Sequence, residues 1–500
     1  MTENRLELRN GRFFDVREGC FHPAGVRLIL NEGRIEALPG LPGEPEAFGG
    51  AAIDLHGKYV LPGLINTHCH TALTSPTLMP DLFSFINSRR LAGTQRALNM
   101  EECVLRGITT LRDAWAGDLR PVQNLRGRIA SGAIQGPRIL QSIVLSPTGG
   151  YLAPAAGFKG NVVRTFAGLP FVDYNSAHSG VIVVRPDAGE AELRDAVDRA
   201  VDGRDADFIK VAEQSEDIVH FKPGASYFSQ AQLAVIADRA RARGKRTTLH
   251  QVTRAGFRRG LAAGIDSLVH LPRDARLEEA DLRALAASAA LVEPTLSMAF
   301  CTAWKVPGDP NAELEDMAKI TRFREEHLEA LARDFWLPEL VPAVLRTLQA
   351  FCSEDFRAFG LVDLSYRYRY YSRVVNFGTE NFRLLYHAGA RFAMGNDGGV
   401  PPCTPAMLGL EFPLMVLFLK DICDRMAFNI PDFIRMATLQ GAEALGLEAT
   451  LGSIEKGKRA DLVVYGDNPL ETPELIGNRA DAVFLDGKLI VNRCGLGVEG

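Results

Sequence analysis

The sequence predicts an α/β protein: a (β/α)8 TIM-like barrel with a small β-sandwich domain formed by both chain termini. Two observations lead to this prediction. In the middle of the chain, apolar strand-like runs alternate with helix-forming stretches eight times, which is typical of buried parallel strands. At each end, short strand-like runs occupy too few residues to bury a core alone, so the two ends are expected to pair.

The terminal segments carry the strand signals of the small domain. Runs such as LELRNGRFFDV and VRLILNEGRIEAL in the first 60 residues contain Asn-Gly and Glu-Gly turn signals, and ADLVVYGDNPL and DAVFLDGKLIVNR near the end look similar. We therefore assign residues 1–60 and 446–500 to one composite β-domain, and residues 61–445 to the barrel.

Eight apolar runs are expected to form the barrel strands. They are residues 59–70, 107–115, 137–147, 206–214, 245–251, 264–271, 290–299 and 390–397. Barrels of this kind carry their active sites at the carboxyl ends of the strands. Residues at these eight ends are therefore the first candidates for function.

One connection is longer than the barrel needs. The surplus lies at about 303–385, between the last two predicted strands, and is rich in helix formers. We read it as a helical insertion over the strand ends. It is either a lid or wall of the substrate pocket, or a contact between subunits, and the sequence leaves both open.

Composition excludes several classes of protein. A net charge of -5 argues against non-specific nucleic-acid binding, and no apolar run reaches membrane-spanning length. The start MTENRLELRN lacks a secretory pattern, and eight scattered cysteines without a CxxC pair indicate reduced thiols. We expect a cytoplasmic homo-oligomer that acts on a small molecule and binds neither nucleic acid nor membrane.

The stretch GLINTHCHT places His68 and His70 two residues apart at the end of an apolar run. On a strand, both imidazoles would lie on one face, about 7 Å apart along the chain, and Cys69 would point the other way. An isolated pair of this kind is weak evidence for a metal site. Its position at a strand end strengthens the interpretation.

Four further residues occupy strand ends. Lys210 lies inside the apolar run DFIKVAE, where an ammonium must be neutralised, paired or chemically modified unless it reaches water at the strand end. His250, His270 and Asp397 each end a later strand. Nitrogen and oxygen ligands of this type suit zinc and related divalent ions.

Longer motifs resemble the amidohydrolase superfamily of metal-dependent hydrolases over nearly the whole chain. They are GKYVLPGLINTHCH, GITTLRDAW, GPRILQS and LGSIEKGKRADLVVYGDNPL. Within that superfamily, DFIKV followed by His250 and His270 is similar to the binuclear branch with a lysine on strand four. That branch includes Xaa-Pro dipeptidases, ochratoxin-hydrolysing amidases, and hydrolases of phenylurea and thiocarbamate herbicides.

The resemblance implies a centre of two divalent metal ions, with Zn2+ expected and Co2+ or Mn2+ as alternatives. The implied ligands are His68, His70 and Asp397 for the more buried ion, His250 and His270 for the second, and Lys210, as a CO2-derived carbamate, for both. The two ions would hold a bridging hydroxide and polarise the substrate carbonyl. Asp397 would then pass a proton from the hydroxide to the leaving nitrogen.

Several positions depart from the dipeptidase pattern. Tyr151 replaces a histidine in SPTGGYL, and Phe228, next to Tyr227, fills a slot where those enzymes often carry tyrosine. Asn396 replaces a Ser or Thr, and the segment after Asp397 lacks its histidines. We therefore expect cleavage of a C–N bond in an amide, carbamate or urea-type molecule rather than in an Xaa-Pro dipeptide. Tyr151, Tyr227, Phe228 and the segment 366–372 are the candidates for the substrate pocket.

Two rival functions follow from the same resemblance. A mononuclear deaminase would carry a Glu three residues after the strand-five histidine, but this chain has Thr253 there. A non-catalytic scaffold on the same fold would normally have lost metal ligands, and none is missing here. Metal analysis separates the scaffold from the enzyme.

Overall fold

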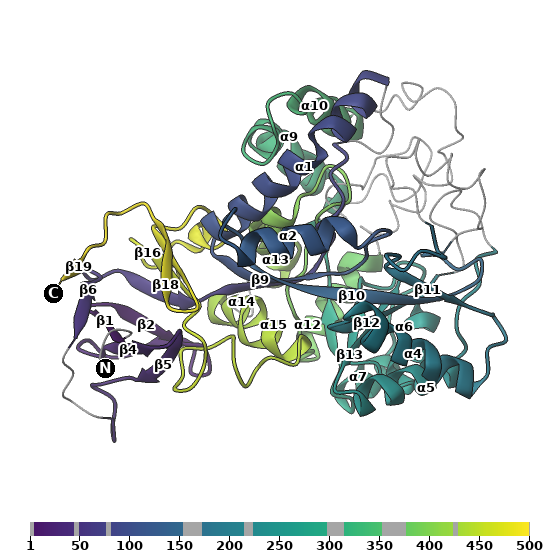
Figure 1. Ribbon diagram of the computed structural model, residues 1–500, viewed down its shortest axis with the longest axis horizontal. Helices are drawn as coiled ribbons and strands as arrows, with labels where there is room; N and C mark the ends of the chain where they lie inside the picture. Colours follow the sequence, from purple (N-terminus) through teal and green to yellow (C-terminus); the bar gives the residue numbers. More distant parts are fainter. Residues whose placement is uncertain are drawn as a thin grey trace.

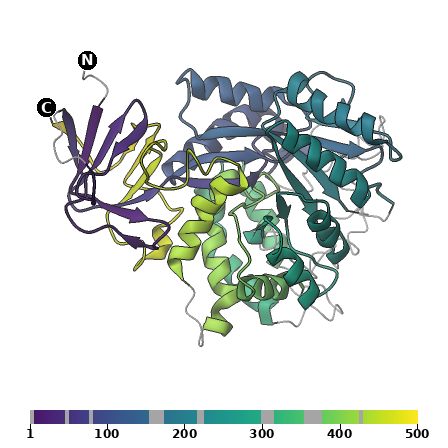
Figure 2. The ribbon, with the colours of Figure 1, turned by 90° about the horizontal axis from the view of Figure 1, so that it is seen from below.

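A computed structural model describes residues 5–44, 50–76, 82–153, 173–214, 224–297, 315–352, 377–423 and 429–499. A barrel with surrounding helices forms the larger part, and two β-sheets built from the chain ends lie beside it (Figure 1, Figure 2). Both termini lie at the far end of this smaller part. The predicted fold class is confirmed, whereas the exact domain boundaries remain predictions.

Seven parallel strands form most of the barrel. In spatial order they are β8 (Leu64–Cys69), β9 (Ile108–Asp113), β10 (Arg138–Pro147), β12 (Phe208–Glu213), β13 (Arg246–Gln251), β14 (Ser267–Val269) and β15 (Leu291–Glu293). β11 (Val181–Val184) was not predicted and adds to β10 outside this path. Most of these residues are buried, as expected for parallel strands covered on both faces.

A segment without regular strand pairing closes the barrel in place of an eighth strand. Phe392 bridges Val292 of β15, and Gly398 bridges Cys69 of β8. The backbone N–H of Asp397 donates to the carbonyl of His68 at 2.8 Å. The run predicted as a strand at 390–397 thus occupies the expected place but has only isolated bridges, because its last residues turn away to form the site described below.

Helices cover the barrel. They are α1 (Leu82–Leu105), α2 (Arg120–Ala130), α4 (Glu190–Arg204), α5 (Gln230–Ala242), α6 (Arg254–Ala262), α7 (Glu279–Ala286), α12 (Thr379–His387), η4 (Pro405–Leu410), α13 (Glu411–Cys423), α14 (Ile430–Ala437) and α15 (Leu439–Ala444). α5 illustrates why they form: Ser229 and Gln232 make a capping box, and apolar residues spaced three and four apart face the core. Among the described helices, none combines the length and apolarity needed to cross a membrane.

The predicted insertion is helical where the structure describes it. α9 (Glu315–Arg333) and α10 (Val341–Cys352) lie side by side next to α1 (Figure 1). The indole N–H of Trp336 donates to the carbonyl of Pro402, and Gln95 of α1 donates to the carbonyl of Phe335. These bonds tie the insertion to α1 and to the loop after Asp397. Residues 303–314 and 353–376 lie outside the described part.

The small domain pairs strands from the two ends of the chain. One sheet has the order β19 (Val498–Glu499), β6 (Ala51–Asp54), β1 (Arg5–Arg9), β4 (Leu28–Asn31), β5 (Arg34–Ala37). The other has the order β18 (Lys488–Asn492), β17 (Ala482–Leu485), β16 (Leu462–Tyr465), β7 (Tyr59–Pro62), β2 (Arg12–Asp15), β3 (Cys20–Phe21), and η5 (Pro473–Leu475) precedes β17. A separate core that includes Phe13, Val60 and Phe484 confirms that neither end buries one alone.

Candidate metal centre

Six side chains from the strand ends meet at the carboxyl side of the barrel. His68, Lys210 and His250 lie in β8, β12 and β13, His70 and His270 directly follow β8 and β14, and Asp397 lies in the irregular segment that closes the barrel. All are buried; the exposed fractions are 1% for His68, 9% for His70, 2% for Lys210, 8% for His250, 2% for His270 and 5% for Asp397.

Two imidazoles contact the same oxygen of Asp397. Nε2 of His68 lies 3.2 Å from Oδ1 of Asp397, and Nε2 of His70 lies 2.9 Å from the same atom. The two rings are nearly perpendicular, with centroids 5.5 Å apart. Three ligand-type atoms therefore lie close together.

The other two histidines meet on the adjoining side. Nε2 of His270 lies 2.9 Å from Nδ1 of His250. Ligand atoms of His68, His270 and Asp397 all lie within 4.8 Å of one another, close enough to share one cation. The two halves of the site are therefore continuous.

The protonation states suit metal binding. Burial lowers the pKa of His68, His250 and His270 well below the ordinary value, which leaves neutral imidazoles. Burial raises the pKa of Asp397, but hydrogen bonds from His68 and His70 outweigh it and hold that pKa well below its usual value. Neutral imidazoles beside a carboxylate are the donor set that divalent zinc takes.

Lys210 is a buried amine without a counter-ion in contact. It makes no hydrogen bond or ion pair with any residue that the structure describes. Burial lowers its pKa to about 7, and the positive charge of Arg112 acts in the same direction. A substantial neutral fraction is the form that reacts with CO2 to give a carbamate. This chemistry fits a lysine that becomes an anionic ligand.

Two of the six residues have unusual backbone conformations. His270 has a φ of 69° and Asp397 a φ of 51°, in the left-handed region that disfavours side chains. Thr295, which hydrogen-bonds His270, has a φ of 49°. Strained residues of this kind concentrate at functional sites, where the surrounding structure holds them in place.

Glycines let strand ends approach each other here. A Cβ on Gly395 would lie 2.6 Å from the Cβ of His68, and one on Gly399 would lie 2.4 Å from the carbonyl oxygen of His70. Gly399 also has a φ of 110°. The close approach of the segment after Asp397 to His70 therefore requires glycine.

Supporting residues that the sequence reading missed orient the histidines. His250 Nε2 lies 2.6 Å from the side-chain oxygen of Gln214, and His270 Nδ1 lies 2.7 Å from the hydroxyl of Thr295. His70 Nδ1 lies 3.2 Å from the carbonyl oxygen of Trp115. Such partners fix ring orientation, but nothing in the sequence spacing marks them.

A fully buried ion pair lies below the site. Arg112 of β9 and Glu293 of β15 are 2.7 Å apart, and both side chains are 0% exposed. Glu293 also accepts a hydrogen bond from Thr67, next to His68. The run GITTLRDAW showed charged residues inside an apolar strand, so the argument applied to Lys210 would have singled out Arg112 as well.

The three predicted pocket residues occupy different places. The ring of Tyr151 stacks on His250 with centroids 4.5 Å apart. Tyr227 is 41% exposed and lies under Arg259, whereas Phe228 is 0% exposed in the main core. Only Tyr151 touches the candidate centre. Segment 366–372 lies outside the described residues.

The family model described as "Amidohydrolase family" matches residues 59–490, which is most of the chain. The chain belongs to the amidohydrolase family. The resemblance drawn from its motifs is thereby confirmed, and this amidohydrolase has the barrel and the His/Asp cluster described above.

Curated relatives match this amidohydrolase over short segments. A 5-methylthioadenosine/S-adenosylhomocysteine deaminase of Teredinibacter turnerae is 32% identical over 119 residues, which is 21% of this chain and 27% of the relative. An imidazolonepropionase of Porphyromonas gingivalis is 37% identical over 82 residues, 16% of this chain and 18% of the relative. The chain thus matches about a quarter or less of their lengths.

Solved structures match the amidohydrolase chain almost end to end. A Xaa-Pro dipeptidase with methionine in its active site has 22% identity and a TM-score of 0.63, covering 98% of this chain and 100% of that chain. The ochratoxinase of A. niger has 18% identity and a TM-score of 0.63, covering 99% and 98%. Molinate hydrolase has 18% identity and a TM-score of 0.64, covering 98% and 95%. At these identities the likeness establishes the fold.

Proposed function

We propose that this amidohydrolase hydrolyses a C–N bond in an amide, carbamate or urea-type small molecule with two divalent metal ions. Zinc is expected, with cobalt or manganese as alternatives. The observation that carries the proposal is Lys210: an unpaired buried amine, with its pKa lowered to about 7, close enough to His68, His250 and Asp397 to interact with them electrostatically.

The residues divide into two ligand sets. The proposed ligands are His68, His70 and Asp397 for one ion, His250 and His270 for the other, and carboxylated Lys210 for both. The convergence of two imidazoles on Asp397, and of His270 on His250, supports this division. When bound, the metals supply Lewis-acid polarisation of a carbonyl and activation of water.

Asp397 is the proposed proton carrier. Its depressed pKa keeps it ionised, and the carboxylate is the form that can accept a proton from the attacking water. The water oxygen forms the new bond to the carbonyl carbon, the C–N bond breaks, and the proton passes to the leaving nitrogen. The left-handed backbone of Asp397 places its carboxylate against the two histidines.

An apolar wall beside the centre favours a non-peptide substrate. Tyr151 stacks on His250, and Trp115 lies 6.3 Å from His70 between ring centroids. Both adjoin an apolar group that includes Leu73 and Leu152. The structural likeness to an ochratoxinase and to molinate hydrolase is in keeping with such a substrate.

A hydrolysis screen tests the proposal. Metal-loaded protein is assayed against N-aryl amides, carbamates, ureas and Xaa-Pro dipeptides, with metal-free protein as the control. We expect kcat/KM to be highest for a member of the first three groups. Much faster cleavage of Xaa-Pro dipeptides would replace this proposal with a dipeptidase, the alternative that the structural likeness to one favours.

A deaminase is less well supported. Some curated relatives are deaminases by name, but the position three residues after His250 is Thr253, whose hydroxyl caps α6 by accepting from the N–H of Gly256. A side chain used in this way offers no proton shuttle. Ammonia release from a purine or pyrimidine would contradict this inference. A non-catalytic scaffold is the other alternative, and less than one bound metal per chain after reconstitution would favour it.

A further inference from the structure

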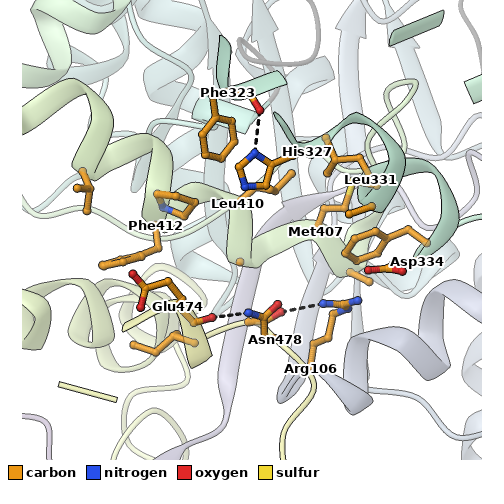
Figure 3. Close-up of a pocket in the computed structure, with 18 residues that line it drawn as sticks. Arg106, Phe323, His327, Leu331, Asp334, Met407, Leu410, Phe412, Glu474 and Asn478 are labelled. Carbon is orange, nitrogen blue, oxygen red and sulfur yellow. Dashed lines mark hydrogen bonds between the residues drawn. The ribbon is translucent and has the colours of Figure 1, made fainter. Parts of the chain in front are cut away.

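A cavity of about 310 Å3 lies apart from the metal centre, among α9, η4, the start of α13 and the segment around η5 (Figure 3). Arg106, one of its lining residues, lies two residues before the amino end of β9. The metal-centre residues lie at the carboxyl ends of the strands. The cavity is therefore a separate space, and its volume is enough for a small ring compound.

Its walls are apolar and its ends are polar. Leu331, Met407, Leu410 and Phe412 line the middle, whereas His327 lies at one end and Arg106 at the other (Figure 3). Flat apolar walls of this kind suit an aromatic ring. The polar groups at the ends decide which ring compounds fit.

Arg106 supplies an unused donor. The residue is 6% exposed, and its guanidinium lies 4.1 Å from the ring centroid of Phe335. Nη1 donates to the carbonyl of Gly477 at 3.4 Å and Nε lies 3.4 Å from Glu102, but Nη2 makes no hydrogen bond with any residue that the structure describes. A buried guanidinium gains from a ligand that provides an acceptor oxygen.

The other polar groups define the charge of that ligand. Asp334 and Glu474 also line the cavity, so Arg106, the one Lys or Arg among its described lining residues, shares the space with two carboxylates, and an anionic ligand is not favoured. Nδ1 of His327 donates to the carbonyl of Phe323 at 2.8 Å, and the rest of its ring lines the cavity. A neutral carbonyl compound, with or without an N–H group, satisfies these constraints.

We propose that this cavity is an effector site for a neutral aromatic carbonyl compound, whose carbonyl accepts from Arg106 and whose occupancy is coupled to the metal centre. The binding half of this proposal, that the compound binds in the cavity, does not depend on the proposed function. The coupling half rests on the metal centre of that proposal.

Glu411 provides the physical connection between the two sites. Its neighbours Leu410 and Phe412 line the cavity, and its own carboxylate accepts from the backbone N–H groups of Leu296 and Ser297 at 2.9 and 2.7 Å. The Ser297 hydroxyl contacts Glu411 and also donates to the carbonyl of Asn396 at 3.0 Å. Asn396 precedes Asp397, so a shift of the cavity wall reaches a proposed metal ligand through two hydrogen bonds.

Calorimetric titration tests the binding half without any turnover. The probes are acetophenone and ethylbenzene, which have similar shapes but differ in the carbonyl oxygen. We expect acetophenone to bind about ten-fold more tightly, because only it can accept from the guanidinium. Ala330 and Glu326 are both exposed positions of α9, but only Ala330 lines the cavity; Ala330→Trp at the rim should therefore occlude the cavity and abolish binding, whereas Glu326→Trp should not.

Equal binding of the two probes, or undiminished binding by Ala330→Trp, would overturn the site.

For the coupling, acetophenone affinity is compared between zinc-loaded and metal-free protein, and by linkage zinc affinity must change by the same factor. We expect a difference of about five-fold or more, and Ser297→Ala should reduce it. Tight binding of acetophenone with no difference between the two forms would overturn the effector role, while leaving the proposed hydrolase untouched.

Discussion

Lys210 and Arg112 are buried basic residues of the same barrel, and they differ in whether a carboxylate partner contacts them. Arg112 has a carboxylate partner in Glu293, which compensates its desolvation. Lys210 has no such partner among the described residues, and its pKa falls. A fixed ion pair maintains structure, whereas an uncharged amine remains available for chemistry. The difference is visible only when the contacts are known.

Replacement of Lys210 by Met tests the role of this amine. The substitution keeps the volume of the side chain but cannot form a carbamate, so we expect loss of most of the bound metal and of hydrolytic activity. Metal content per chain is measured by plasma emission spectrometry after reconstitution. Lys488→Met, at an exposed position, serves as the control. Full metal content in Lys210→Met would contradict the binuclear assignment.

Glu411 should make stability depend on pH. Burial raises its pKa to about 7 from an ordinary 4.5, so the folded state keeps the proton longer than the unfolded state does. The contribution of Glu411 to the stability of the metal-free protein, taken as the difference between the wild type and Glu411→Gln, should therefore be full below about pH 4.5, fall by about 3 kcal/mol up to pH 7, and then level off. Urea unfolding across this range measures it. Glu411→Gln should flatten this part of the profile, and an unchanged slope would exclude Glu411 as its source.

At the scale of elements, the barrel strands and terminal pairing followed from apolar runs and turn signals, because these patterns reflect burial directly. The position of the eighth strand was predicted correctly, but its irregular form was not. That form depends on tertiary contacts, because Asp397 and Gly399 have positive φ angles where the chain packs against other parts of the barrel. Of the candidate site, the six strand-end residues were predictable from position. Gln214, Thr295 and Glu293 were not, because their partners come from other strands.

The glycine turn after Asp397 can be tested with a matched pair of substitutions. Gly399→Ala would place a methyl group 2.4 Å from the His70 carbonyl at a φ of 110°, whereas Gly25→Ala has a comparable φ of 94° but nothing within 4 Å. We expect the second to cost about 1 kcal/mol of unfolding free energy from backbone strain alone. The first should cost more and also weaken zinc binding about ten-fold. Equal effects on stability and zinc affinity would mean that the close approach is unimportant.

At the scale of the whole molecule, Arg138 joins the two parts of the structure. Lying at the start of β10, it donates to Asp461 and to Asp486, both in the C-terminal segment, at 2.9 Å each. Asp461 is 6% exposed and so depends on this partner. The small domain is thereby held to the amino end of a barrel strand, opposite the metal centre.

Loss of this link should be costly. Arg138→Leu leaves a buried carboxylate without its cation, and we expect a loss of about 3 kcal/mol in unfolding free energy. Arg120→Leu removes an arginine that is 69% exposed in its ion pair with Asp118, so its effect should be near zero. Urea denaturation of both variants makes the comparison. Similar small losses in the two would show that Arg138 does not hold the domain.

The pairing of β7 with β16 and of β6 with β19 has a consequence for biosynthesis. Each pair joins strands separated by the entire barrel sequence, so neither can form until the ribosome has delivered the last part of the chain. Until then the apolar faces of the first strands lack half of their core and are exposed to association with other chains. Nascent chains that stall before β16 should therefore be recognised by chaperones or proteases, even when most of the barrel has been made.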